Sequence, residues 1–241
     1  SPLLDDLRAA LRWASDPSGD LALAEALTAA SVPVWFSLSL LGEFLQHAER
    51  TLGQGVDVAS ARQRDRIRLC IAVGLARWHT AGGTPQMQAA FAQAAQLATE
   101  HGDLAHQLRA VWGMALACNA NADYPGSHRL ALRFSELIGP APSEPMTVGR
   151  SLMMMLGEHL TGHHGRAMAE AQAVIARRTS ATFVGASTGT QFDPRVASMA
   201  MLARTHWMLG RAATARQYAD EALDQALALD HAVSLCFVVA L

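Results

Sequence analysis

Apolar residues recur at intervals of three and four along most of the chain, which is the spacing of one face of an α-helix. The clearest stretch runs from Asp193 to Asp230. Asp193 and Pro194 have the residue types of an N-cap and a first helical position, and Gly210 interrupts the pattern. Two amphipathic helices joined at one glycine predict an αα-hairpin. The inward face of its first helix is predicted to hold Met199, Leu202, Ala203, His206 and Leu209.

The same periodicity predicts helices along the rest of the chain. Asp20 and Asp103 are expected to cap two of them, and Pro33 to kink or stop another. The segment 179–192 has no helical period and is predicted to be a loop, either a lid or a connection. The remaining predicted helices cover 3–14, 21–40, 43–52, 57–81, 85–101, 103–118, 124–138, 143–161 and 165–176.

The predicted corners between paired helices are regularly spaced. They fall at Gly42, Gly82, Ala122, Gly165 and Gly210, at intervals of 40, 40, 43 and 45 residues. Such a spacing is typical of a helical repeat, in which each hairpin hides its apolar face against the next. The sequence therefore predicts an all-α protein built from repeated hairpins.

The hairpin at 193–230 resembles a tetratricopeptide repeat. Leu202-Ala203, Gly210, Ala215 and Ala222-Leu223 match that family's small and apolar positions, whereas Ala212 stands where the family usually has an aromatic residue. The resemblance implies a right-handed α-α superhelix, a TPR-like solenoid of about five helical hairpins, with residues 1–241 as a single domain. The intervals exceed the ~34 residues of the standard unit, so longer helices or linkers are expected.

Three stretches are also similar to the repeat region of large bacterial signal-transduction ATPases. They are DLRAALRWA at 6–14, FDPRVASMAMLARTHWMLG at 192–210, and the final 27 residues from Ala215. In that family, such repeats are joined to ATPase and DNA-binding domains. The resemblance implies a sensor and coupling region of a transcriptional regulator. The first predicted helix has no partner before it and the last residues, HAVSLCFVVAL, begin a helix with no partner after it, so we expect this chain to be a fragment of a longer one, truncated at both ends.

Charge and composition limit the kinds of molecule that this chain is expected to bind. A net charge of −2 favours no direct contact with nucleic acid or with anionic membranes. No apolar run is long enough to span a membrane, and three widely spaced cysteines are typical of buried thiols in a reducing cytoplasm. The absence of lysine excludes Schiff-base and phosphate-loop chemistry. We therefore expect a cytoplasmic protein.

The resemblance also implies a concave surface lined by the first helix of each pair. An arginine and a tryptophan on such a surface are suited to an acidic or aromatic ligand. The more ordinary alternative is that Trp112 and Trp207 pack in the core and that the arginines are solvated. The candidate ligand-binding residues are Arg109, Trp112, Asn119, Met154, Glu158, Arg204 and Trp207.

The sequence gives less support for a metal site, a basic patch or a catalytic site. His159 and His163 have a helical metal spacing, but Gly162 is expected to break the helix and Glu158 to point elsewhere, so an exposed turn is favoured over a metal site. The arginines at 62, 64, 66 and 68 divide between two helix faces and are predicted to be solvated. No motif marks a nucleophile or an acid-base pair, so we expect no catalytic residues, no cofactor and no enzyme activity.

The leading prediction is a non-catalytic sensor domain that binds a protein or small-molecule effector and passes occupancy to the ATPase and DNA-binding domains of its parent chain. The alternative is a protein-protein interaction scaffold or self-association module without a small-molecule ligand, for which a homo-oligomer is possible.

Overall fold

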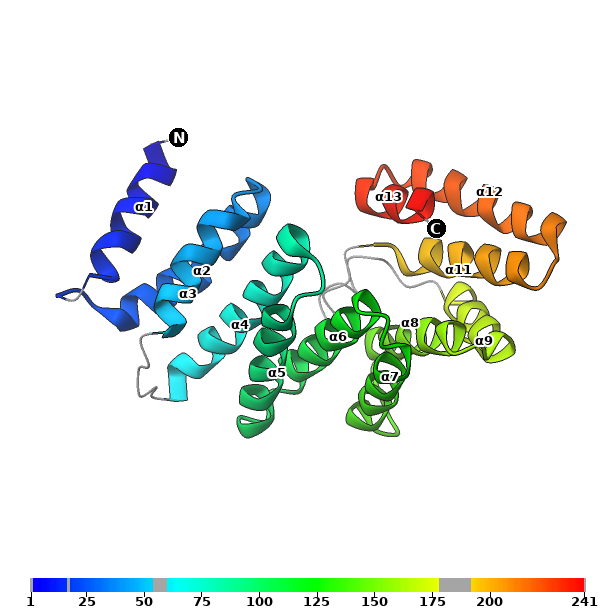
Figure 1. Cartoon of the computed structure of the whole chain (residues 1–241), viewed down its shortest axis with the longest axis horizontal. Coiled ribbons are helices and arrows are strands. Elements are labelled where there is room, and N and C mark those ends of the chain that lie inside the picture. The colour runs from blue at the N-terminus through cyan, green and yellow to red at the C-terminus, as the bar shows by residue number, and fades with distance from the viewer. Residues whose placement is uncertain (1, 17, 54–59, 178–191, 241) are drawn as a thin grey trace. The chain divides into compact units, whose positions relative to one another are not determined.

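A computed structural model describes residues 2–16, 18–53, 60–177 and 192–240 (Figure 1). This part of the chain holds twelve α-helices and no strand, which confirms the all-α prediction. The chain divides into two compact units, residues 1–121 and residues 122–241, and each is described by itself.

The first unit consists of six helices that follow one another in the order of the chain. Neighbouring helices pack together, and α4 also packs against α2 and α6. The helices are α1 (Pro2–Ala14), α2 (Leu21–Ser37), α3 (Leu41–Gly53), α4 (Ser60–Ala81), α5 (Pro85–Glu100) and α6 (Leu104–Ala120).

The second unit is organised around α11, which packs against four other helices, α8, α9, α12 and α13. Figure 1 shows α12 beside α11, with α13 next to both (orange to red). The helices are α7 (Tyr124–Ile138), α8 (Glu144–Leu160), α9 (His164–Ile175), α11 (Pro194–Met208), α12 (Ala212–Ala228) and α13 (Ala232–Ala240).

The predicted caps are present. The Asp193 carboxylate accepts hydrogen bonds from the backbone N–H groups of Arg195 and Val196, each at 2.9 Å. Asp20 and Asp103 cap α2 and α6 in the same way. Each carboxylate satisfies N–H groups that have no partner within the helix, so these starts are set by local sequence.

Two predicted corners are misplaced. Gly42 lies inside α3 and Gly165 inside α9, and the residues with positive φ at these turns are Ser39 (56°) and Gly162 (85°). The left-handed position is the residue just after the helix C-cap, and Ser39 takes it although it is not glycine. The corner at Gly210 is confirmed, with a φ of 74°.

Other expectations have mixed outcomes. Pro33 does not stop α2, which continues to Ser37.

Two predictions fall outside the described residues. They are the helix start at Asp57 and nearly all of the segment 179–192, so whether that segment is a lid or a connection stays a prediction. Arg66 is not solvated as predicted: its side chain is 13% exposed, 3.8 Å from the buried carboxylate of Glu25.

The core of the first unit is built from large side chains that meet small ones. Phe91 of α5 is 1% exposed, and its ring lies against Gly74 of α4 and Gly113 of α6. A Cβ atom at Gly113 would lie 2.2 Å from that ring, and one at Gly74 would lie 2.6 Å from it. The two glycines therefore make the room that the aromatic ring fills.

A candidate ligand pocket between α11, α12 and α13

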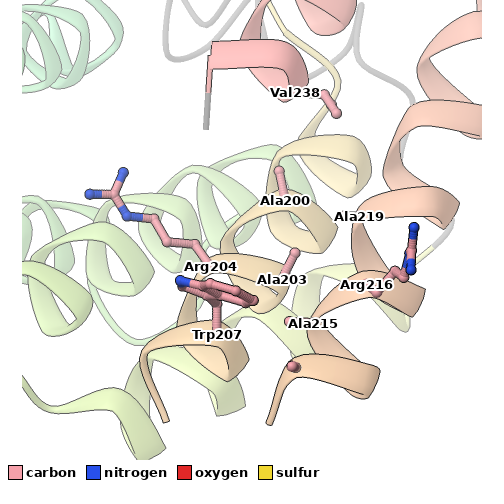
Figure 2. Close-up of a pocket in the computed structure, with 9 residues that line it drawn as sticks. Ala200, Ala203, Arg204, Trp207, Ala215, Arg216, Ala219 and Val238 are labelled. Carbon is pink, nitrogen blue, oxygen red and sulfur yellow. The ribbon is translucent and has the colours of Figure 1, made fainter. Parts of the chain in front are cut away.

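The second unit contains a pocket with a volume of about 540 Å³ (Figure 2). Its walls come from α11 and α12, and α13 contributes one residue at the edge. Nine described residues line it: six are alanine or valine, and the others are two arginines and a tryptophan. The lining residues are Ala200, Ala203, Arg204, Trp207, Ala212, Ala215, Arg216, Ala219 and Val238.

The pocket exists because small side chains face each other across the hairpin. Ala200 and Ala203 on α11 meet Ala215 and Ala219 on α12, and no methyl group reaches far enough to fill the space between the helices. Figure 2 shows these alanines between Trp207 and Arg204 on one helix and Arg216 on the other. The result is an apolar floor with charged and aromatic groups at its rim.

Trp207 lies at this rim and is 69% exposed. The alternative interpretation, that this tryptophan is a core packing residue, is therefore wrong. An indole ring left in water beside an apolar pocket is available for stacking against a ligand, and tryptophan is the side chain that does so best.

Arg204 and Arg216 are both exposed and form no ion pair within the described part of the chain. Elsewhere in the same unit, Arg150 makes a bidentate pair with Glu170, with N–O distances of 3.1 and 3.2 Å. Because the two pocket arginines have no such carboxylate partner among the described residues, none of these residues competes with an anion for their N–H groups.

The neighbourhood of Arg204 contains a buried imidazole rather than an acid. His159 of α8 is 4% exposed, and its Nδ1 lies 2.9 Å from the hydroxyl oxygen of Thr205. Burial first, and then the charges of Arg204 and His164, lower the pKa of His159 to about 4. His159 is thus neutral at pH 7 and does not compete with a ligand for Arg204.

Glu158 has a different environment from the one expected of a groove residue. Its side chain is 3% exposed, and its carboxylate oxygens lie 3.3 Å from His128 Nε2, 2.9 Å from His163 Nδ1 and 3.3 Å from Arg166 Nε. The expectation that Glu158 points away from His163 is wrong. The turn after α8 folds back, with the His163 N–H donating to the Glu158 carbonyl at 2.8 Å, which brings the two side chains together.

The other predicted residues do not line the pocket. Met154 is half-buried on α8. Arg109, Trp112 and Asn119 are half-buried on α6 in the first unit. Burial, together with the charge of Arg68, lowers the pKa of Arg109. Of the seven predicted residues, only Arg204 and Trp207 belong to the pocket.

Arg216 was missed because the prediction considered only the first helix of each pair. The sequence of α12 does indicate a pocket, because alanines on facing helices leave space and an arginine at its edge supplies charge. The residues that carry this pattern are Ala212, Ala213, Ala215, Arg216 and Ala219. Val238 was missed for a different reason: α13 is brought to the pocket only by tertiary packing.

The described residues include no group of three or more His, Cys, Asp or Glu side chains placed to hold a metal ion. Cys70 and Cys118 are buried as predicted, and burial raises the pKa of the Cys70 thiol to about 11. Cys236 on α13 is exposed, which corrects the expectation of three buried thiols.

No helix in the described ranges is long and apolar enough to cross a bilayer. A comparison with protein-family models finds no match to this chain, and no curated protein matches its sequence.

Proposed function

We propose that this chain is a non-catalytic binding module and that the pocket between α11, α12 and α13 holds a small anionic ligand with an apolar or aromatic part. The proposal rests on one observation: two arginines without ion-pair partners among the described residues and an exposed tryptophan surround an alanine-floored pocket.

Size and chemistry support a small molecule. A volume of about 540 Å³ lies within the range of small-molecule sites, which are mostly apolar with a few polar groups that orient the ligand. The alanine floor offers apolar contact, the guanidinium groups offer charge-assisted hydrogen bonds, and Trp207 offers an aromatic face. The described lining residues include no nucleophile, acid or base, and we therefore propose binding without catalysis.

The wider role follows the resemblance. We propose that the consecutive helix pairs form a TPR-like superhelix in a bacterial, cytoplasmic transcriptional regulator. A ligand that prefers one curvature of the helices shifts the population toward that state, only by as much as its affinities for the two states differ. The support is the packing of α2 on α3, α4 on α5, α8 on α9 and α11 on α12.

A second candidate is a scaffold or self-association module. The observation in its favour is a row of exposed leucines on α12 and at its end: Leu223, Leu227 and Leu229 are 37%, 57% and 47% exposed. Large exposed apolar side chains that gather on one helix are typical of protein contacts.

Isothermal titration calorimetry with small aromatic carboxylates, sulfonates and phosphates tests the leading proposal. We expect binding in the micromolar to millimolar range that Trp207→Ala weakens about tenfold, as expected for loss of about 1.4 kcal/mol of stacking. Met208→Ala is the control, because Met208 is the next residue, is 57% exposed and does not line the pocket. Absence of binding by every compound, together with concentration-dependent dimerisation in sedimentation equilibrium, would favour the scaffold.

A further inference from the structure

The outer face of α1 carries large apolar side chains in contact with water. Leu3 and Trp13 are 79% and 62% exposed, whereas Leu11 on the inner face is fully buried. Within the described part of the first unit, α1 packs mainly against α2, so its opposite face is left open. A leucine and a tryptophan exposed on one short helix are typical of a contact surface.

Two aspartates lie on either flank of this outer face. Asp5 and Asp6 are both exposed, and neighbouring residues of a helix point about 100° apart, so the carboxylates lie at nearly one level with Trp13 between their directions. Asp5 forms an exposed pair with Arg8 at 3.2 Å, which contributes little. Asp6 forms no ion pair among the described residues.

The pocket of the second unit has the opposite charge in a matching arrangement. Arg204 and Arg216 each lie six residues from Gly210, so they stand at one level of two antiparallel helices. Figure 2 shows them on opposite sides of the alanines, with the Arg204 side chain reaching away from α12. The two arginines are therefore placed to flank a helix that lies on the alanines, with one cation on each side.

A helix already lies in the neighbouring part of the same groove. α13 packs against both α11 and α12, and its residue Val238 lines the edge of the pocket. On α11, the residues from Val196 to Leu202 are all buried, whereas Arg204 and Trp207 further along are exposed. The pocket is thus the uncovered continuation of a groove that α13 partly fills, and its alanines allow a further helix to approach closely.

We propose that α1 of a second copy of this chain docks in this pocket, with Asp5 and Asp6 against the two arginines. The inference rests on the second candidate function, self-association, and a small ligand would compete with α1 for the same space. Apolar contact of Trp13 with the groove supplies most of the affinity, and the charges fix the position. Because the two surfaces differ, the contact joins copies head to tail, in a closed ring or an open chain.

Sedimentation velocity of the purified chain at rising concentrations tests this contact. We expect the wild type to form dimers or larger species. Asp5→Arg with Asp6→Arg, and Arg204→Glu with Arg216→Glu, should each raise the dissociation constant at least tenfold, because attraction becomes repulsion. The chain that carries all four substitutions should associate again, because its charges match once more.

Two single reversals at other exposed positions are the controls. Glu100→Arg, at the end of α5, and Arg211→Glu, in the turn between α11 and α12, change the same kinds of charge outside the pocket and outside α1. Both should associate as the wild type does. The four substituted positions are exposed, and circular dichroism verifies that each variant folds.

The outcomes separate this inference from the function on which it rests. A wild type that stays monomeric at every concentration overturns the inference together with self-association. Association that neither double variant weakens overturns the docking of α1, while self-association stands. Loss of association in both double variants without recovery in the fourfold variant also overturns the inference, since the aspartates and arginines then do not meet.

Discussion

Three consecutive helices in each unit use small residues in opposite ways. In α4, α5 and α6, Gly74 and Gly113 stand on either side of Phe91, whose ring fills the space that they leave. In α11, α12 and α13, alanines also face one another, but no large side chain enters from either helix and a pocket of about 540 Å³ remains.

The comparison teaches that small residues at a helix contact do not by themselves indicate close packing. They leave room, and whether the room is filled depends on one side chain from a neighbouring helix. Phe91 fills it in the first unit, whereas in the second unit Trp207 turns outward and is 69% exposed. The pocket of the second unit thus remains open beside a residue that does not enter the gap.

The largest expected effect is that of removing the filling ring. Phe91→Ala should lower the free energy of unfolding by about 3 to 5 kcal/mol, because it leaves a cavity between two glycines that have no side chains to collapse into it. Urea denaturation measures the loss. The control Leu227→Ala, at a 57% exposed position, should change it by less than about 0.5 kcal/mol. A loss below about 1 kcal/mol for Phe91→Ala would show that the ring does not fill this space.

Adding a methyl group next to the same ring should also destabilise. In Gly113→Ala the new Cβ would lie 2.2 Å from the Phe91 ring, and the ring cannot move away because Gly74 packs against it on the other side. We therefore expect the free energy of unfolding to fall by about 2 kcal/mol, despite the better helix propensity of alanine. Gly165→Ala in α9 is the matched control, since nothing lies within 4 Å of a Cβ there, and it should be neutral or stabilising. Equal thermal melts for the two variants would refute the tight contact.

Lowering the pH should reduce the stability of the protein through the buried His159. His159 has a pKa of about 4 when folded, below its ordinary 6.5, so the unfolded chain binds the proton more readily. The stability that this residue contributes is present above pH 6.5 and is lost as the pH falls toward 4. Between pH 7 and pH 5 we expect a loss of about 1 to 2 kcal/mol from this group.

Urea denaturation of wild type and His159→Gln at both pH values isolates this contribution, because carboxylates affect the two proteins equally. The variant should lose less stability than the wild type on acidification. An identical loss in both proteins would mean that His159 is not buried as a neutral side chain.

Filling the pocket with Ala219→Leu should have the smallest effect on stability and a large effect on binding. Ala219→Leu adds a side chain at an exposed position that lines the pocket, so unfolding should change by less than about 0.5 kcal/mol while the ligand space is partly filled. Calorimetry with 2-naphthyl phosphate should then show at least a tenfold loss of affinity. Ala213→Leu, also exposed on α12 but outside the pocket, should leave binding unchanged. Unchanged binding in Ala219→Leu would exclude this pocket as the site.

Sequence reasoning predicted two of the pocket residues, Arg204 and Trp207, and missed Arg216 and Val238. It identified the first pair because they lie on one helix close to a recognisable corner. It missed the others because it assigned function to only one helix of the hairpin and had no means to bring α13 to the site. It also assigned Glu158 to a groove, although that carboxylate is enclosed by His128, His163 and Arg166.

The sequence by itself determined the helices, their caps at Asp20, Asp103 and Asp193, and the corner at Gly210, because each depends on residues within a few positions of one another. Only the tertiary structure decided which space stays open and which charges stay unpaired. Those properties depend on residues distant in sequence, as in the contact of His159 with Thr205, 46 positions apart. Helical periodicity specifies which face turns inward, but the shape and charge of what it meets there come from the neighbouring helices.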